Sequence, residues 1–267
     1  MVGNADPQVT AAKLKNVPII RLLPNMLTIL ALCSGLTAMR YAFDGHWAHA
    51  ALAIVVASLF DILDGRVARV LGVTSKFGAE LDSLADLTNF GVVPALVLYL
   101  WELRETDSLG WIGVLVYVVC TATRLARFNT MLEDQNAPAW ARCYFIGVPS
   151  PAGAAIALLP LFLVIRFGPD IQMPPIFLAL WIIAAGLLMV TRLPTLSMKG
   201  RSIPPVWVAP IMAVACLLVA ALITDPFLAL SVLAIAYIIS VPYGFYCYQR
   251  REQLENSREE QPAQIDS

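Results

Sequence analysis

Four aspartates lie within otherwise apolar sequence, with Asp61 and Asp64 in one group and Asp82 and Asp86 in the next. Spacings of three and four residues place the members of each pair on one face of a helix. A charge at the centre of a bilayer costs about 2.5–3.5 kcal/mol, and four carboxylates would also repel one another. Cations relieve that repulsion, and ligation by oxygen alone selects hard divalent ions such as Mg²⁺, Mn²⁺ or Ca²⁺. The spacing therefore predicts a metal site shared by two neighbouring helices.

Small residues accompany the aspartates on the same predicted helix faces, with Gly65 and Ala68 in the first group and Gly78 in the second. Such residues let helices or a ligand approach closely. In an alternative interpretation the aspartates only form ion pairs near the membrane edge, with Arg66, Arg69 and Lys76. Because ionisable clusters within membranes usually serve a function, the metal site is the favoured interpretation.

The composition indicates that these helices lie in a membrane. Of the 267 residues, 59% are apolar and 14% are charged, and the mean hydropathy is +0.72. Soluble domains typically carry about 25% charged residues, so a water-soluble globular fold is excluded. The 18 basic and 19 acidic residues nearly balance, so no nucleic-acid partner is expected.

Eight apolar stretches predict an all-α fold, a polytopic transmembrane helix bundle of about eight spans. With the N-terminus placed inside, the outer loops hold only Arg40, Arg104 and Arg166, and all other lysines and arginines lie toward the inner side. This distribution follows the positive-inside rule, and the even number of spans predicts that both termini are cytoplasmic. The stretches lie near residues 19–43, 47–71, 83–101, 109–129, 151–167, 175–192, 205–223 and 226–248.

The aspartates belong to a longer pattern, Asp61-x2-Asp64-Gly65-x2-Ala68-Arg69-x8-Gly78-x3-Asp82-x3-Asp86. Every fixed position and gap resembles the signature of the CDP-alcohol phosphotransferase family. Within that family the chain is most similar to the integral-membrane phosphatidylserine synthases, and the resemblance covers about residues 18–200. One departure is Asn89, where a serine is expected. The segments that extend the likeness are Pro24-Asn25-x2-Thr28, Phe90-Gly91, Arg124-x2-Arg127-x-Asn129 and Gly147-x-Pro149-x-Pro151.

The resemblance implies both an activity and an organisation of the chain. The activity is transfer of a phosphatidyl group from CDP-diacylglycerol to an alcohol, with L-serine as the favoured acceptor and CMP as the leaving product. The organisation is a six-helix catalytic core over residues 18–200 and two further helices over 201–249, with polar segments at 1–17 and 250–267. The resemblance further implies two divalent cations, Mg²⁺ or Mn²⁺, and a homodimer among membrane lipids. The expected location is the bacterial cytoplasmic membrane, with the active site facing the cytoplasm.

The same resemblance assigns roles to individual residues by position. Asp86 is the expected general base as well as one of the metal ligands, which are Asp61, Asp64, Asp82 and Asp86. The residues assigned to binding CDP-diacylglycerol are Gly65, Ala68, Arg69, Ser75, Gly78, Asn25 and Thr28. The residues expected to bind the acceptor are Asn89, Arg124, Arg127 and Asn129.

The chemistry of these side chains agrees with the implied reaction. Arg69 presents a planar fork that can hold phosphate oxygens in a way that lysine cannot. Arg124 or Arg127 can hold the carboxylate of an amino-acid acceptor, or both can simply anchor their helix at the inner membrane surface.

Two other functions are considered. A sibling enzyme would use glycerol 3-phosphate, inositol phosphate or choline as the acceptor. A cation or proton transporter would instead use the aspartates to line a pathway, but transporters usually show internal repeats with broken helices in both halves. Here the acidic residues of the membrane region concentrate in one segment, which makes a transporter the least favoured of the three.

Overall fold

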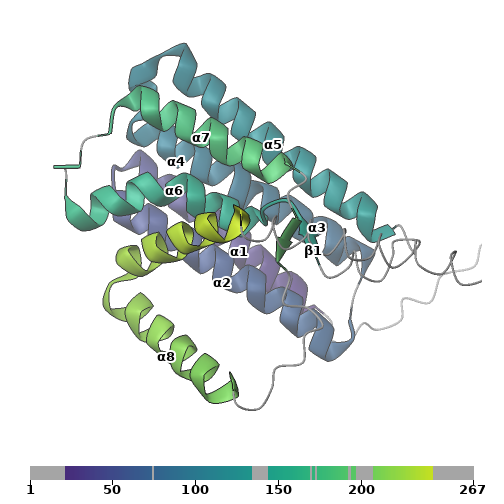
Figure 1. Cartoon of the computed structure of the whole chain (residues 1–267). Helices are drawn as coiled ribbons and strands as arrows, with labels where there is room; N and C mark the ends of the chain where they lie inside the picture. Colours follow the sequence, from purple (N-terminus) through teal and green to yellow (C-terminus); the bar gives the residue numbers. More distant parts are fainter. Residues whose placement is uncertain are drawn as a thin grey trace, which may run out of the picture.

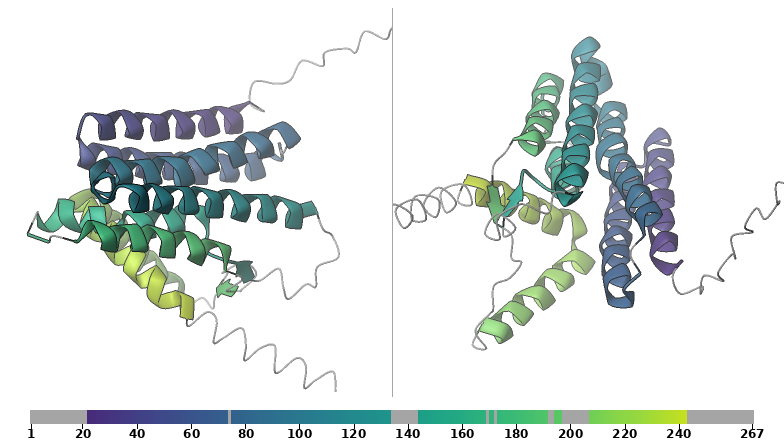
Figure 2. Two further views of the ribbon diagram at one scale, coloured as in Figure 1. Left: turned by 90° about the horizontal axis from the view of Figure 1, so that it is seen from above. Right: turned by 90° about the vertical axis from the view of Figure 1, so that its right-hand side faces the viewer.

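The computed structural model describes residues 22–73, 75–133, 144–168, 170–171, 173–191, 194–196 and 207–242. The predicted all-helical fold is confirmed, and each of the eight predicted stretches contains a helix. The N-terminal helices run side by side with nearly parallel axes (Figures 1 and 2). The helices are α1 (Leu23–Phe43), α2 (Trp47–Leu71), α3 (Lys76–Asp86), α4 (Val93–Trp101), α5 (Ser108–Glu133), α6 (Ser150–Phe167), α7 (Pro175–Val190), α8 (Val208–Thr224) and a last helix, Pro226–Pro242.

Four of the described helical segments are long and apolar enough to cross a membrane. They are Leu23–Phe43, Lys76–Trp101, Ser108–Thr130 and Ser150–Phe167. Shorter apolar helices follow at Pro175–Val190, Val208–Thr224 and Pro226–Pro242. The predicted polar segments 1–17 and 250–267 lie outside the described residues.

The helical segment Lys76–Trp101 is longer and less regular than its apolar stretch predicts. It begins at Lys76 rather than near residue 83, and it joins α3 to α4 through a π-helical turn, η2 (Leu87–Val92). Ser75 provides the start, because its Oγ accepts a hydrogen bond from the Gly78 amide at 3.0 Å. A single 3₁₀ turn, η3 (Leu103–Thr106), then leads into α5.

Small side chains allow α1 and α2 to pack closely. Ala38 and Ala42 of α1 and Ala50 and Ala51 of α2 are buried in the core that the two helices share with α4 to α7. Because these side chains end at Cβ, the two backbones approach closely, as is usual where membrane helices pack. The closely packed α1–α2 pair lies beside α3.

Two features depart from a simple bundle. β1 (Tyr144–Ile146) and β2 (Pro194–Leu196) form a short antiparallel ribbon that the sequence patterns did not indicate. α8 has no buried residue and stands away from the other helices in Figure 1. The last helix returns to the bundle, where Val241 joins the buried core.

Candidate active site

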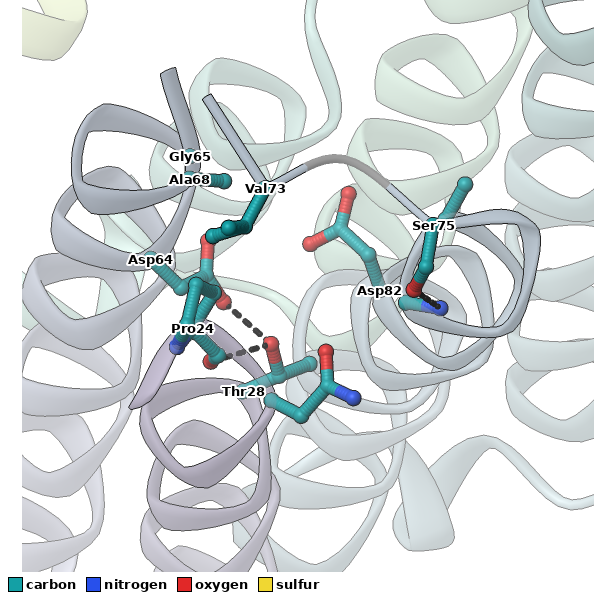
Figure 3. Close-up of a pocket in the computed structure, with 11 residues that line it drawn as sticks. Pro24, Thr28, Asp64, Gly65, Ala68, Val73, Ser75 and Asp82 are labelled. Carbon is teal, nitrogen blue, oxygen red and sulfur yellow. Dashed lines mark hydrogen bonds between the residues drawn. The ribbon is translucent and has the colours of Figure 1, made fainter. Parts of the chain in front are cut away.

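A pocket of about 140 Å³ lies where the N-terminal end of α1 meets the last turns of α2 and the first turns of α3. In Figure 3, Asp64 and Thr28 lie on one side of this pocket, and Asp82 and Ser75 lie on the other. The pocket is lined by Pro24, Asn25, Thr28, Asp64, Gly65, Ala68, Val73, Ser75, Gly78, Ala79 and Asp82.

The short connection between α2 and α3 explains why the two pairs of aspartates meet. α2 ends at Gly72, whose φ of 62° is the left-handed conformation that glycine adopts without strain. α3 starts at Lys76, immediately after its cap Ser75. The chain therefore reverses within a few residues, and the end of α2 faces the beginning of α3.

Three of the four aspartates converge closely. Asp61, Asp64 and Asp82 each place a carboxylate oxygen within 4.8 Å of the others. Asp64 is 4% exposed, and the other two are partly buried. Three carboxylates this close repel one another strongly unless a cation lies between them, so the donor set fits a hard divalent metal ion.

Asp86 lies one helical turn beyond Asp82 and beside Asp61. The Asp61 and Asp86 carboxyl groups approach to hydrogen-bonding distance of each other. Asp86 Oδ1 is buried, and no donor among the described residues reaches it. Asp86 is thus linked to the cluster through Asp61.

Thr28 supports the cluster directly. Its hydroxyl donates to Asp64 Oδ2 at 2.7 Å and also lies 3.1 Å from the Pro24 carbonyl oxygen. Thr28 and Asp64 are both 4% exposed, so water does not compete for this contact. The resemblance assigned Thr28 to the CDP-diacylglycerol site, and the structure shows that it also holds the Asp64 carboxylate, which is one of the predicted metal ligands.

Replacement of Thr28 by valine should weaken metal binding. The substitution keeps the shape of the side chain but removes the donor, and the loss of such outer partners typically costs about 10–100-fold in metal affinity or activity. We expect the Mn²⁺ concentration required for half-maximal Mn²⁺ binding to rise by that factor. Thr37→Val on the same helix is the control, because its exposed hydroxyl bonds only its own helix, at the Cys33 carbonyl. Equal Mn²⁺ affinity in Thr28→Val and wild type would contradict this role.

The other residues assigned to CDP-diacylglycerol lie around the pocket. Asn25, Gly65, Ala68, Ser75 and Gly78 line it. A Cβ atom at Gly78 would lie 2.9 Å from Asn25 Oδ1 and 3.1 Å from Ser75 Oγ, so only glycine fits there without displacement of its neighbours.

Arg69 differs from these residues because its side chain is exposed and is absent from the pocket wall. Its Nε donates to the Gly65 carbonyl oxygen at 2.8 Å. The residue therefore lies beside the pocket, held over the same turn of α2 that carries Gly65.

A second group of buried polar side chains lies near Asp86. Arg124 on α5 is 9% exposed, interacts electrostatically with Asp86, and donates from Nη1 to Ser150 Oγ at 2.6 Å. Asn89 in η2 is 1% exposed, and its Oδ1 points at Gly35 of α1, where any Cβ would collide with it. Neither Arg124 Nε nor Asn89 Oδ1 has a hydrogen-bond partner among the described residues.

The other two residues expected at the acceptor site hold helices together. Arg127 Nη2 donates to the Val190 carbonyl oxygen at 3.1 Å, at the end of α7. Asn129 Nδ2 donates to Ser83 Oγ at 2.9 Å and so ties α5 to the turn of α3 that follows Asp82. These contacts connect α5 to the end of α7 and to α3.

Some residues near the site were missed by sequence reasoning. The π-helical turn η2 begins directly after Asp86, and π-turns occur frequently at functional sites. The Tyr117 hydroxyl donates to the Phe90 carbonyl oxygen of this turn at 2.9 Å. No periodicity in the sequence marks a π-turn. The hydrogen bond from the buried Tyr117 to a distant backbone carbonyl likewise becomes visible only in the fold.

The chain matches two models of protein families. The model described as CDP-alcohol phosphatidyltransferase matches residues 21–169, which include the whole aspartate pattern. The model described as CDP-alcohol phosphatidyltransferase 2 matches residues 206–242, which are α8 and the last helix. The two C-terminal helices showed no diagnostic pattern by themselves, and this second match adds them to the family likeness.

Curated proteins of similar sequence carry one name, CDP-diacylglycerol–serine O-phosphatidyltransferase. The protein of Mycobacterium leprae is 40% identical over 228 residues, which cover 85% of this chain and 75% of the relative. The protein of Mycobacterium tuberculosis is 41% identical over 226 residues, which cover 84% of this chain and 78% of the relative. The protein of Helicobacter pylori is 37% identical over 138 residues, 52% of this chain and 56% of the relative.

Proposed function

The chain belongs to the CDP-alcohol phosphatidyltransferase family, and from this premise we propose that it transfers the phosphatidyl group of CDP-diacylglycerol to L-serine. The products are phosphatidylserine and CMP. The observation that carries the proposal is the convergence of the Asp61, Asp64 and Asp82 carboxylates, with Asp86 beside them. The name shared by the similar curated proteins supports serine as the acceptor.

Two divalent cations, Mg²⁺ or Mn²⁺, complete the site in this proposal. Asp61, Asp64, Asp82 and Asp86 hold them, and Thr28 fixes the orientation of the Asp64 carboxylate. When bound, such cations neutralise negative charge on the pyrophosphate and on the departing CMP. The positive charge of the cations would also offset the repulsion among the four closely spaced carboxylates.

The pocket beside the cluster receives the CDP part of the donor. Asn25 and Ser75 offer polar atoms, and the absence of side-chain bulk at Gly65, Ala68 and Gly78 leaves space for the nucleotide. Arg69 has an exposed side chain next to this space, where its planar fork can hold phosphate oxygens.

The acceptor enters from the side of Asp86. The Asp86 carboxylate accepts the proton of the serine hydroxyl as the oxygen atom attacks phosphorus. Arg124, whose charge lies near Asp86, holds the serine carboxylate, and Asn89 contributes its amide to the same region. In this arrangement Asp86 activates the acceptor and Arg124 recognises its carboxylate.

The membrane setting follows from the length and charge of the helices. We propose eight spans with a six-helix core, both termini in the cytoplasm, and a site that opens to the cytoplasm. A helix of 25 residues such as α2 is about 37 Å long, which exceeds a hydrocarbon core of about 30 Å. Its last turns carry Asp64, Arg66 and Arg69 and can therefore reach the polar surface, where the positive-inside rule puts arginine on the cytoplasmic side. The bacterial cytoplasmic membrane and a homodimer remain predictions from the family resemblance.

The identity of the acceptor is tested by comparing the rates with different alcohols. Purified chain in detergent is given CDP-diacylglycerol and Mn²⁺, and CMP release is measured with L-serine, glycerol 3-phosphate, inositol phosphate or choline offered one at a time. We expect serine to give by far the highest rate, because serine is the one of these four alcohols that carries a carboxylate for Arg124 to bind. A higher rate with another alcohol would contradict serine as the acceptor, and no CMP release with any of them would contradict the reaction class.

A further inference from the structure

Arg124 is held by a residue that has no role in the proposed chemistry. Its Nη1 donates to Ser150 Oγ at 2.6 Å, and Ser150 is the first residue of α6. The guanidinium therefore connects α5 to the start of α6.

The position of Ser150 is built into the turn before α6. Gly147 has a φ of 86°, and a Cβ there would lie 2.6 Å from the Met189 carbonyl oxygen of α7, so this turn requires glycine. Pro149 then leads into α6 with Ser150 at 0% exposure. A turn pressed against α7 thus fixes one hydroxyl beside the buried guanidinium.

The buried guanidinium of Arg124 has a donor that can bind a further anionic group. A buried guanidinium is normally paired with a carboxylate. Among the described residues, however, no carboxylate lies within 4 Å of the Arg124 guanidinium, and the ion pair that is present joins Arg166 and Asp225 elsewhere in the fold. Arg124 has a neutral serine at Nη1, and its Nε has no partner among the described residues. A carboxylate-bearing ligand next to Asp86 would supply both the charge and the acceptor that Nε lacks.

We propose that Ser150 is a positioning residue that orients Arg124 toward the carboxylate of the acceptor, so that the start of α6 takes part in acceptor selection. This inference rests on the proposed function and adds the residue through which that site distinguishes an amino acid from a simple alcohol. Ser150 fixes one end of the guanidinium, which leaves Nε directed at the ligand. The hydroxyl of the bound L-serine would then be directed toward Asp86.

The test is the effect of Ser150→Ala on the two substrates separately. A hydrogen bond to a charged group is worth more than a neutral one, and its loss corresponds to a factor of about ten or more in affinity. We expect the KM for L-serine to rise about tenfold while the KM for CDP-diacylglycerol stays within about twofold of wild type. Ethanolamine, which lacks the carboxylate, serves as a second acceptor, and the preference of wild type for serine over ethanolamine should fall by a similar factor in the variant.

Ser231→Ala is the matched control. Ser231 is 2% exposed, and its hydroxyl bonds only the Phe227 carbonyl oxygen of its own helix, so both KM values should stay at wild-type level. A serine KM unchanged in Ser150→Ala, or an equal rise in both KM values, would overturn the positioning role. If Ser150→Ala does not yield folded protein, Ser150→Cys, which keeps the size of the side chain but replaces the hydroxyl by a weak acceptor, decides by the same two KM values. A wild-type chain that releases no CMP with serine would instead contradict the proposed function itself.

Discussion

Asp82→Ala is expected to abolish CMP release while the protein stays folded. Asp82 supplies one of three carboxylate oxygens that lie within 4.8 Å of one another, so its removal opens the ligand set. Loss of the carboxylate also relieves repulsion on Asp61 and Asp64, which offsets the lost metal binding in the folded state. The variant should therefore unfold, in the absence of divalent ions, at a temperature no lower than that of wild type.

Three measurements check this prediction together. CMP release measures activity, Mn²⁺ titration followed by electron paramagnetic resonance measures metal binding, and the thermal unfolding midpoint measures stability. Glu80→Ala is the matched control, because Glu80 is an exposed carboxylate on the same helix that is outside the cluster. If Asp82→Ala binds Mn²⁺ as tightly as wild type, Asp82 is not a ligand and the metal site is misassigned.

Asp86→Asn is expected to reduce the turnover of serine by about 10²–10⁴-fold, the usual effect of losing a general base. The amide has the size of the carboxyl group and one oxygen atom, so it can still coordinate a cation, but it cannot accept the proton of the serine hydroxyl. The buried Oδ1, which no described donor reaches, is the atom available for that proton. Binding of CDP-diacylglycerol with Mn²⁺ should persist in this variant.

The measurement compares single-turnover CMP release with equilibrium binding of CDP-diacylglycerol. A slow reaction at unchanged donor affinity supports Asp86 as the base. Near-normal turnover with the wild-type pH profile would transfer the role to another group, with Asp82 the first to test. Loss of donor binding together with turnover would indicate that Asp86 acts mainly as a metal ligand.

The sequence was sufficient to predict that the aspartates converge, because local spacing largely determines it. Aspartates three and four residues apart share a helix face, and the short connection before Ser75 brings the two faces together. The eight apolar stretches likewise predicted where helices form, because hydrophobic length is a property of the chain itself. Both predictions depend on neighbours in sequence.

Contacts between distant segments could not be predicted in this way. Thr28 supports Asp64 from 36 residues away, and Asn129 bonds Ser83 from 46 residues away. Arg127 and Asn129 were predicted from their residue types, and the sequence did not indicate the Val190 carbonyl and the Ser83 hydroxyl that they bond in the fold. The π-turn after Asp86 and the ribbon between β1 and β2 also depend on the tertiary fold, and no short pattern marks either of them.

The central claim is that the aspartate cluster performs a metal-dependent phosphatidyl transfer, and depletion of divalent ions from the wild-type enzyme tests it most directly. Purified chain is treated with a chelator and freed of metal, and CMP release from CDP-diacylglycerol and L-serine is then measured while Mn²⁺ or Mg²⁺ is added back. We expect the rate to fall to background after chelation and to return with either ion, and phosphatidylserine to form in equal amount to CMP. An unchanged rate in the metal-free protein would contradict metal-dependent transfer by the aspartate cluster.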